Sequence, residues 1–344
     1  MDRRNFIKGV GSIVASSGAI GVPTLSADTY ENNLNASKEK ALQRIAFGSC
    51  NRQGRSQMHW DVISQDNPDL WLWLGDNIYA DWSTEDERRK QWNNLKFNPY
   101  YDRFRRNTAI MGTWDDHDYG SNNQGKSFEG KAISQQLFAD FLDVPHDHPM
   151  RLQEGIYHTE TFGPQGQQTQ VFMLDGRYFK GNPANDGFLG DVQWAWLEAE
   201  LLASTADLLI ISSGIHVTSG ITGLGMEGWN SYPAERRRLY DIIERIDAPV
   251  LFLSGDRHMA EFVEHKLESG KRIYEFMSSG LTHGFYVPLP HPGRIGKATG
   301  RNNYGLINID WTSQGPQLGL EIKDPDQQGI IDKVQPNFHN GLLG

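Results

Sequence analysis

Short runs of apolar residues alternate along the chain with segments in which apolar residues recur every three or four positions. The runs are bounded by glycine or polar residues, as is typical of strands buried on both faces of a sheet. Seven runs are predicted strands: Arg44–Cys50, Asp69–Asp76, Thr108–Asp116, Thr169–Asp175, Asp207–His216, Ala248–Asp256 and Arg272–Gly280. Four segments between them are predicted helices: Thr84–Asn94, Ala132–Leu142, Asp191–Ala203 and Ala234–Ile246.

The alternation of strands and helices predicts an α/β domain with largely parallel strand pairing. No internal repeat or linker interrupts the pattern, so we expect one domain over residues 28–344. The segment from Pro288 onward is rich in Gly, Pro and Asn, and is predicted to form loops with one strand near YGLINIDW, residues 304–311.

Residues 1–27 have a different character. Arg3 and Arg4 precede a short, weakly apolar stretch rich in Gly, Ser and Ala that ends at Ala27, a pattern typical of a twin-arginine signal peptide. The segment Gly9–Val22 is too short and too polar to span a bilayer, so we expect no stable membrane anchor. The sequence therefore predicts export through the twin-arginine translocation machinery to the periplasm or the extracellular space.

Charge and cysteine content narrow the function further. The formal net charge is −10 and no basic stripe is visible, which argues against a nucleic-acid-binding surface. Cys50 is the only cysteine of the 344 residues, so it forms no intrachain disulfide and needs another role.

Six of the seven predicted strands end on, or run directly into, residues that can bind a metal ion or a proton: Cys50, Asp76, Asp115–His117, Asp175, His216 and Asp256–His258. One such aspartate is more often a cap of the following helix or turn, whereas a recurring pattern indicates a shared site. The carboxyl ends of strands form the ligand-binding edge of α/β sheets. A two-metal site needs one bridging carboxylate; Asp76 suits that role, with Tyr79 three residues later as a ligand.

The motifs FGSCN, GDNIY, WDDHDYG, FMLDGRYF, EGWNSYPAERRRL and SGDRHMAEF, in this order, resemble the PhoD-like branch of the calcineurin-like metallophosphoesterases of the purple-phosphatase type. The resemblance runs from about Arg44 to Gly280. It implies a layered α/β/β/α sandwich with a metal site at the carboxyl ends of the strands. It also implies an alkaline phosphatase or phosphodiesterase that acts on a small phosphate-ester substrate, by attack of a hydroxide generated at the metals.

The resemblance also implies the ligands of both metals. One site, for Fe³⁺, would consist of Cys50, Asp76, Tyr79 and His258, and the second, for a divalent cation, of Asp76, Asp116, His216 and Asp256. The chain departs from the wider superfamily at Asp116 and Asp256, where asparagine and histidine are usual. Because hard oxygen ligands favour hard cations, we predict Ca²⁺ at the second position.

Candidate residues for catalysis lie beside these ligands. We expect His117 to act as the general acid, oriented by Asp118, with metal binding or a structural hydrogen bond as the alternative roles of His117. Arg177 and Arg257 are suited equally to contacts with phosphate oxygens and to salt bridges with the nearby carboxylates.

Two other classes of protein remain open at this point. One is a mononuclear zinc hydrolase that uses Cys50, His216 and His258, and the other is a non-catalytic metal- or phosphate-binding protein of the cell envelope. His146 and His148 are expected in a surface turn, and His283 is expected near the pocket. The sequence leaves open whether the substrates are phosphate monoesters or diesters, and it does not indicate the oligomeric state.

Overall fold

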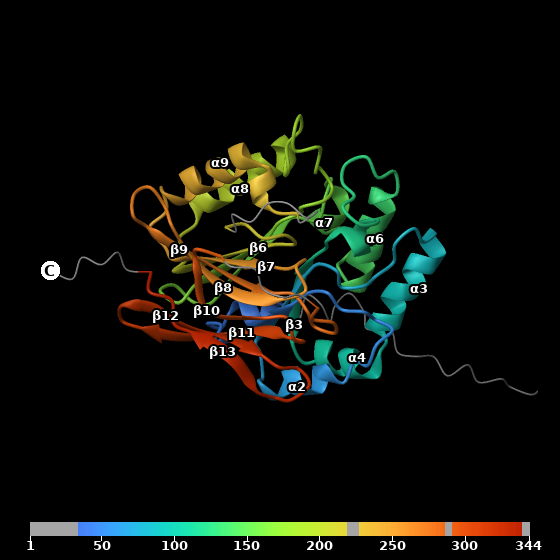
Figure 1. Ribbon diagram of the computed structural model, residues 1–344, viewed down its shortest axis with the longest axis horizontal. Coiled ribbons are helices and arrows are strands. Elements are labelled where there is room, and N and C mark those ends of the chain that lie inside the picture. The colour runs from blue at the N-terminus through green and yellow to red at the C-terminus, as the bar shows by residue number, and fades with distance from the viewer. Residues whose placement is uncertain (1–33, 219–226, 286–290, 339–344) are drawn as a thin grey trace, which may run out of the picture.

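The computed structural model describes residues 34–218, 227–285 and 291–338. In this part of the chain, two mixed sheets pack face to face and helices cover their outer faces (Figure 1). The strands of the first sheet are β1 (Arg44–Gly48), β2 (Leu70–Leu74), β3 (Ala109–Thr113), β11 (Tyr304–Thr312), β12 (Gly315–Lys323) and β13 (Ile330–Val334). Their order across the sheet is β13–β12–β11–β1–β2–β3.

The second sheet has a parallel centre with antiparallel edges. Its strands are β4 (His158–Phe162), β5 (Thr169–Met173), β6 (Leu208–Ser213), β7 (Val250–Ser254), β8 (Ala260–Lys266), β9 (Arg272–Ser278) and β10 (Arg294–Thr299). They lie in the order β10–β8–β9–β7–β6–β5–β4. The neighbours β5, β6, β7 and β9 are parallel, as are β1, β2 and β3 in the first sheet.

Helices occupy the two outer layers. The first sheet is covered by α2 (His59–Gln65), α3 (Glu85–Lys96), α4 (Pro99–Arg105) and α6 (Lys131–Phe141). The second sheet is covered by α8 (Gly190–Ala203) and α9 (Pro233–Ile243), at the top of Figure 1. The short elements α5 (Asp116–Tyr119), α7 (Pro149–Leu152) and η1 (Trp229–Ser231) lie in connections.

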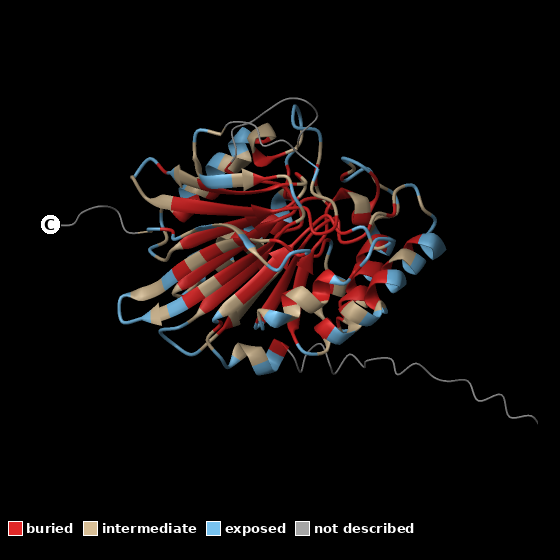
Figure 2. Ribbon diagram, turned by 60° about the horizontal axis from the view of Figure 1, so that its bottom comes forward, coloured by how far each residue is buried: buried red, intermediate tan, exposed pale blue. Residues whose placement is uncertain are grey.

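The central core lies between the two sheets, where the strands are buried along most of their length (Figure 2). Phe47 of β1 meets Phe276 of β9 edge to face, with ring centroids 4.7 Å apart. A second cluster contains Trp60, Trp71 and Trp73 and packs the first sheet against its helices. The layered α/β/β/α prediction is therefore confirmed.

All seven predicted strands and all four predicted helices are present near their predicted positions. The prediction of largely parallel pairing holds for the sheet centres and is wrong at the edges, where β4, β8, β10, β11, β12 and β13 pair antiparallel. The segment after Pro288 contains three strands besides the predicted one. The outermost of these strands, β4, β10 and β13, are half-buried and carry polar residues, so they lack the continuous apolar run that marks a central strand.

The predicted signal peptide, residues 1–27, lies outside the described residues. Among the described helices, none has the length and apolar character needed to cross a membrane.

Candidate metal centre

The ends of the parallel strands from both sheets meet at one edge of the molecule. The chain leaves β1 and β2 side by side, because Cys50 N–H donates to the Gly75 carbonyl (3.3 Å) and Asn51 N–H donates to the Asp76 carbonyl (2.8 Å). At Gly255, after β7, an added Cβ would lie 2.6 Å from the Leu74 carbonyl oxygen at the end of β2. Glycine at this position lets the ends of the two sheets approach each other closely.

Three predicted ligands surround the carboxylate of Asp76. The Cys50 sulfur lies 3.5 Å from Asp76 Oδ2, and the Tyr79 hydroxyl lies 3.2 Å from the same oxygen. Ligand atoms of Cys50, Asp76 and His258 all lie within 4.8 Å of one another. The structure thus brings together the four residues predicted to hold the first metal.

A second group shares Asp76. Ligand atoms of Asp76, Asp116 and His117 lie within 4.8 Å of one another, so His117 stands closer to this group than the predicted pair His216 and Asp256, which belong to neither set. Asp256 still lies near enough to Asp116 for the two charges to interact. His216 is completely buried after β6, and both of its ring nitrogens lack a hydrogen-bond partner among the described residues.

The backbone at this edge is strained. Nine described residues other than glycine have a positive φ, and four of them are predicted ligands: Cys50 (57°), Asp76 (49°), Asp256 (71°) and His258 (51°). A non-glycine residue in this region costs about 1–3 kcal/mol, and such residues concentrate at functional sites where the surrounding structure holds them. The strain therefore supports one shared site at these strand ends.

The buried acidic side chains of the cluster would be stabilised in their ionised form by a nearby positive charge. Burial raises the pKa of Asp76 well above its usual range, and the neighbouring Cys50 and Asp116 raise it further. Burial also raises the pKa of Asp256, aided by Asp115 and Asp116. The pKa of the Cys50 thiol is raised to about 11, mainly by burial. Side chains that resist ionisation in this way become good anionic ligands only when a cation is bound beside them.

Some of the candidate ligand atoms are buried and have no hydrogen-bond partner. Asp116 Oδ1 and both nitrogens of His216 are buried and form no hydrogen bond within the described part of the chain. Burial, together with the charge of Arg257, lowers the pKa of His216 to about 3, so its imidazole is neutral and able to donate a lone pair. Since buried polar atoms are normally satisfied, these donors fit bound cations.

His117 is oriented by Asp81 and not by Asp118. Its Nδ1 lies 2.7 Å from Asp81 Oδ2, and its ring packs against that of Tyr79 with centroids 4.5 Å apart. The Asp118 carboxylate accepts backbone N–H groups from Asn77 (3.0 Å) and Asp115 (2.6 Å). The prediction that Asp118 orients His117 is therefore wrong, because the side chain of Asp118 closes its own turn.

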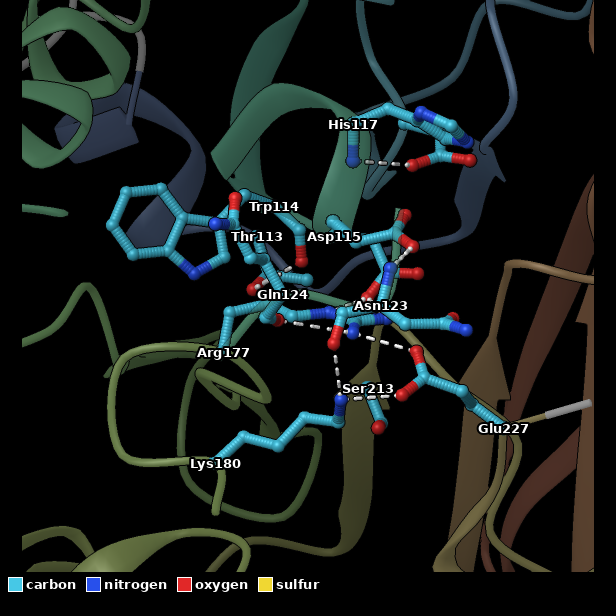
Figure 3. A network of polar contacts seen from close by, with 12 residues as sticks. Thr113, Trp114, Asp115, His117, Asn123, Gln124, Arg177, Lys180, Ser213 and Glu227 are labelled. Atoms are coloured by element: carbon cyan, nitrogen blue, oxygen red, sulfur yellow. Dashed lines mark hydrogen bonds and ion pairs between the residues drawn. The ribbon is translucent and has the colours of Figure 1, made fainter. Parts of the chain in front are cut away.

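Arg177 is held in a buried network behind the ligands (Figure 3). Its guanidinium lies 2.6 Å from Asp115 Oδ1 and 2.6 Å from Glu227 Oε2, and Lys180 pairs with the other oxygen of Glu227. Of its two predicted roles, this geometry favours the salt bridge over a phosphate contact. Arg257 is buried as well, directly after Asp256.

A cleft of about 480 Å³ opens beside the cluster. It is lined by Arg52, Gln53, Gly54, Arg55, Tyr79, Asp81, Gln91, His117 and His258. His283 lies at the same place, with its ring 4.4 Å from that of His258. By contrast, His146 is exposed, and Nδ1 of His148 accepts the Met150 N–H at the start of α7.

Asp81, Glu227 and Arg52 were not found from the sequence. Asp81 follows Tyr79 by two residues in GDNIYAD, so its proximity to the motif was a usable signal. Glu227 is the first residue of the motif EGWNSYPAERRRL, which was a usable signal for it, whereas Arg52 comes from a loop and no local pattern marks it.

The candidate ligands lie in a region that matches a known protein family. The PhoD-like phosphatase family model matches residues 45–299, which include every candidate ligand. Alkaline phosphatase D of Bacillus subtilis (strain 168) is 26% identical over 214 residues, which make up 50% of this chain and 36% of that protein. The chain therefore spans little more than a third of the length of this curated relative.

Two solved structures share the fold. A structure of PhoD superposes with a TM-score of 0.64 at 18% identity and covers 89% of this chain and 74% of its own. GAP50, the anchor in the inner membrane complex of Plasmodium, gives a TM-score of 0.60 at 12% identity, with coverage of 87% and 90%. At these identities the likeness shows the architecture alone.

Proposed function

The chain belongs to the PhoD-like phosphatase family, and on that premise we propose that it is a metal-dependent phosphoesterase that hydrolyses phosphate monoesters or diesters. The observation that carries the proposal is the pair of ligand groups that share Asp76 at the strand ends. The architecture alone would leave the activity open, since it also occurs in the Plasmodium anchor.

The side chains divide the work of such a reaction. Bound cations would neutralise charge on the phosphoryl oxygens and lower the pKa of the attacking water. Asp76 holds the two halves of the centre together because it belongs to both ligand groups. With Nδ1 held by Asp81, His117 has Nε2 left to donate a proton to the leaving oxygen.

The ligand types suggest which cations bind. Phenolate and thiolate from Tyr79 and Cys50 favour Fe³⁺ in the first position, completed by Asp76 and His258. For the second position we keep Ca²⁺, held by Asp76 and Asp116 with Asp256 and His216 nearby, because carboxylate oxygens dominate this side of the centre.

The paired arginines at the amino terminus support export by the twin-arginine route as part of the same proposal. Proteins on this route are translocated after folding, which suits a centre whose ligands come from distant parts of the chain. The substrate is expected to be a small phosphate ester that reaches the enzyme in the periplasm or outside the cell.

Replacement of Asp76 tests the proposal. Asp76→Asn should lower hydrolysis of both 4-nitrophenyl phosphate and bis(4-nitrophenyl) phosphate by at least about a hundredfold, because the amide loses the shared anionic ligand. Elemental analysis should show that the variant binds less iron and less calcium than the wild type. Asp310→Asn, at an exposed position on β11, is the matched control and should keep both metals and the activity.

The outcomes separate the competing functions. Full activity in Asp76→Asn, or a wild-type protein that contains one zinc ion and no iron, would favour the mononuclear zinc hydrolase. Metal binding without hydrolysis of either ester would favour the non-catalytic binding protein. The zinc alternative has less geometric support, because His216 does not join the group that contains Cys50 and His258.

A further inference from the structure

The cleft beside the metal centre contains two arginines that the proposed reaction does not yet use. Arg52 and Arg55 lie on the loop after β1, only two and five residues beyond Cys50. Both side chains are exposed, and both line the cleft together with Tyr79 and His117. The loop turns back on itself here, because Arg55 N–H donates to the Arg52 carbonyl oxygen (2.9 Å).

Both arginines are held in place by contacts that leave their charge uncompensated. The Arg52 guanidinium lies over the Tyr79 ring, 5.1 Å from its centroid, and Arg55 Nη1 donates to the Thr282 carbonyl oxygen (2.8 Å). Thr282 also anchors the loop, because its hydroxyl accepts the Arg52 backbone N–H (2.7 Å). In the part of the chain that the structure describes, neither guanidinium forms an ion pair with a carboxylate, although Asp and Glu outnumber Lys and Arg by 43 to 33.

Asp81 is the carboxylate among the described residues that line the cleft, and it is engaged elsewhere. Asp81 binds the His117 ring through Oδ2 (2.7 Å) and accepts the Asn122 N–H through Oδ1 (3.0 Å). The cleft therefore combines two fixed cations with the expected position of the leaving group, next to His117.

We propose that, if the chain is the phosphoesterase described above, Arg52 and Arg55 bind a second anionic group on the leaving-group side of the substrate. A guanidinium forms paired hydrogen bonds with carboxylate or phosphate oxygens, and two of them on one wall select for such a group. The substrate class is then phosphate esters of alcohols that themselves carry a carboxylate or a phosphate. The scissile phosphate lies on the other side of Tyr79, where the hydroxyl of this residue meets Asp76.

Three substrates with matched rings test the proposal. Phenyl phosphate has a neutral leaving group, 4-carboxyphenyl phosphate adds a carboxylate, and 4-(phosphonomethyl)phenyl phosphate adds a phosphate-like dianion. The wild type should prefer one or both charged substrates, and the double variant Arg52→Gln/Arg55→Gln should reduce that preference in kcat/KM by about tenfold or more, mainly through KM. The two charged substrates show which anion is recognised.

Arg245→Gln is the control, because it removes an exposed positive charge just after the end of α9 and should leave the preference unchanged. Thermal unfolding of each variant checks that it is folded. If the double variant loses all three substrates to the same extent, the arginines bind the scissile phosphate and the proposal is overturned. Equal kcat/KM values for neutral and charged substrates in the wild type would overturn it as well.

A binding experiment separates this proposal from the proposed activity. Calorimetry with 4-carboxyphenylphosphonate, which cannot be hydrolysed at its P–C bond, should show binding to the wild type that is at least about tenfold weaker in the double variant. Such binding in a protein that hydrolyses none of the esters would remove the phosphoesterase function and retain the anion site. Hydrolysis without arginine-dependent binding would retain the phosphoesterase function and overturn the anion site. If the protein neither hydrolyses the esters nor binds the phosphonate through the arginines, both proposals are overturned.

Discussion

Arg177 is a side chain that could bind phosphate or form a structural salt bridge. Its position between Asp115 and Glu227 leaves it fully buried, and the two carboxylates raise the pKa of its guanidinium against the opposing effect of burial. Asp115 comes directly before the candidate ligand Asp116, so the guanidinium also fixes the turn that carries this candidate ligand. A buried charge of this kind is tolerated because it is paired.

Replacement of Arg177 by methionine should therefore destabilise the protein. Arg177→Met leaves the carboxylate of Asp115 buried without its partner, which should lower the free energy of unfolding by about 3–5 kcal/mol. Urea unfolding of the purified protein measures the change. Arg237→Met, which breaks an exposed ion pair with Glu268, is the control and should cost less than about 1 kcal/mol. A stable Arg177→Met protein with weakened phosphate affinity would instead assign Arg177 to substrate binding.

At the scale of single elements, α2 contains a titratable group that is not among the candidate ligands. His59 is buried beside Trp60, with ring centroids 4.9 Å apart, and its Nε2 has no partner among the described residues. Burial lowers the pKa of His59 from 6.5 to about 3, so the imidazole is neutral in the folded protein at neutral pH.

This burial predicts a loss of stability in acid. Above pH 6.5 the folded and unfolded states bind the same number of protons at His59. Below pH 6.5 only the unfolded chain gains a proton there, so the free energy of unfolding falls, and it continues to fall until about pH 3. At pH 5 the loss is about 2 kcal/mol. His59→Leu should thus lose about 2 kcal/mol less than the wild type between pH 7.5 and pH 5 in urea unfolding. The difference in unfolding free energy between the two proteins at pH 7.5 measures the effect of the changed packing alone. An identical pH dependence of both proteins would contradict the prediction.

Elements differ in how far the sequence reveals them. Central strands such as β2 and β7 could be predicted because both faces are buried and every residue is apolar or small. Edge strands such as β13 could not, because half of each strand faces solvent and the partner that pairs with it is distant in sequence.

The candidate ligands could be predicted for the same reason as the central strands. Cys50, Asp76 and His216 each follow a continuous apolar run, so their place at the sheet edge is set by the strand before them. Asp81 and Glu227 contact this centre through loops, and the path of a loop depends on tertiary packing. The apolar runs therefore predicted where the candidate ligands lie, but the short-range pattern misassigned the residue that orients His117.

At the scale of the whole molecule, the first sheet is assembled from both halves of the chain. Its parallel strands come from residues 44–113, and β11 adds antiparallel to β1 with Ile45 opposite Ile307. The residues matched by the family model end at position 299, before β11 begins.

A chain that ends after Thr299 should therefore fail to fold, although it contains every candidate ligand. Without β11, the edge of β1 exposes unpaired backbone groups, and apolar residues such as Ile307 no longer cover the core. The soluble fraction on expression and the near-UV circular dichroism measure the result. A soluble truncated protein with native-like aromatic signals and iron bound would show that the core closes without β11.

The pairing of β1 with β11 also sets the order of events during synthesis. About 250 residues separate the two strands, and at about 5–20 residues per second the ribosome needs roughly 13–50 s to pass from one to the other. Throughout that interval Cys50 and Asp76 are attached to a strand with one open edge, so the growing polypeptide has no finished place for a cation. We therefore expect any metal to be loaded only after the chain is complete.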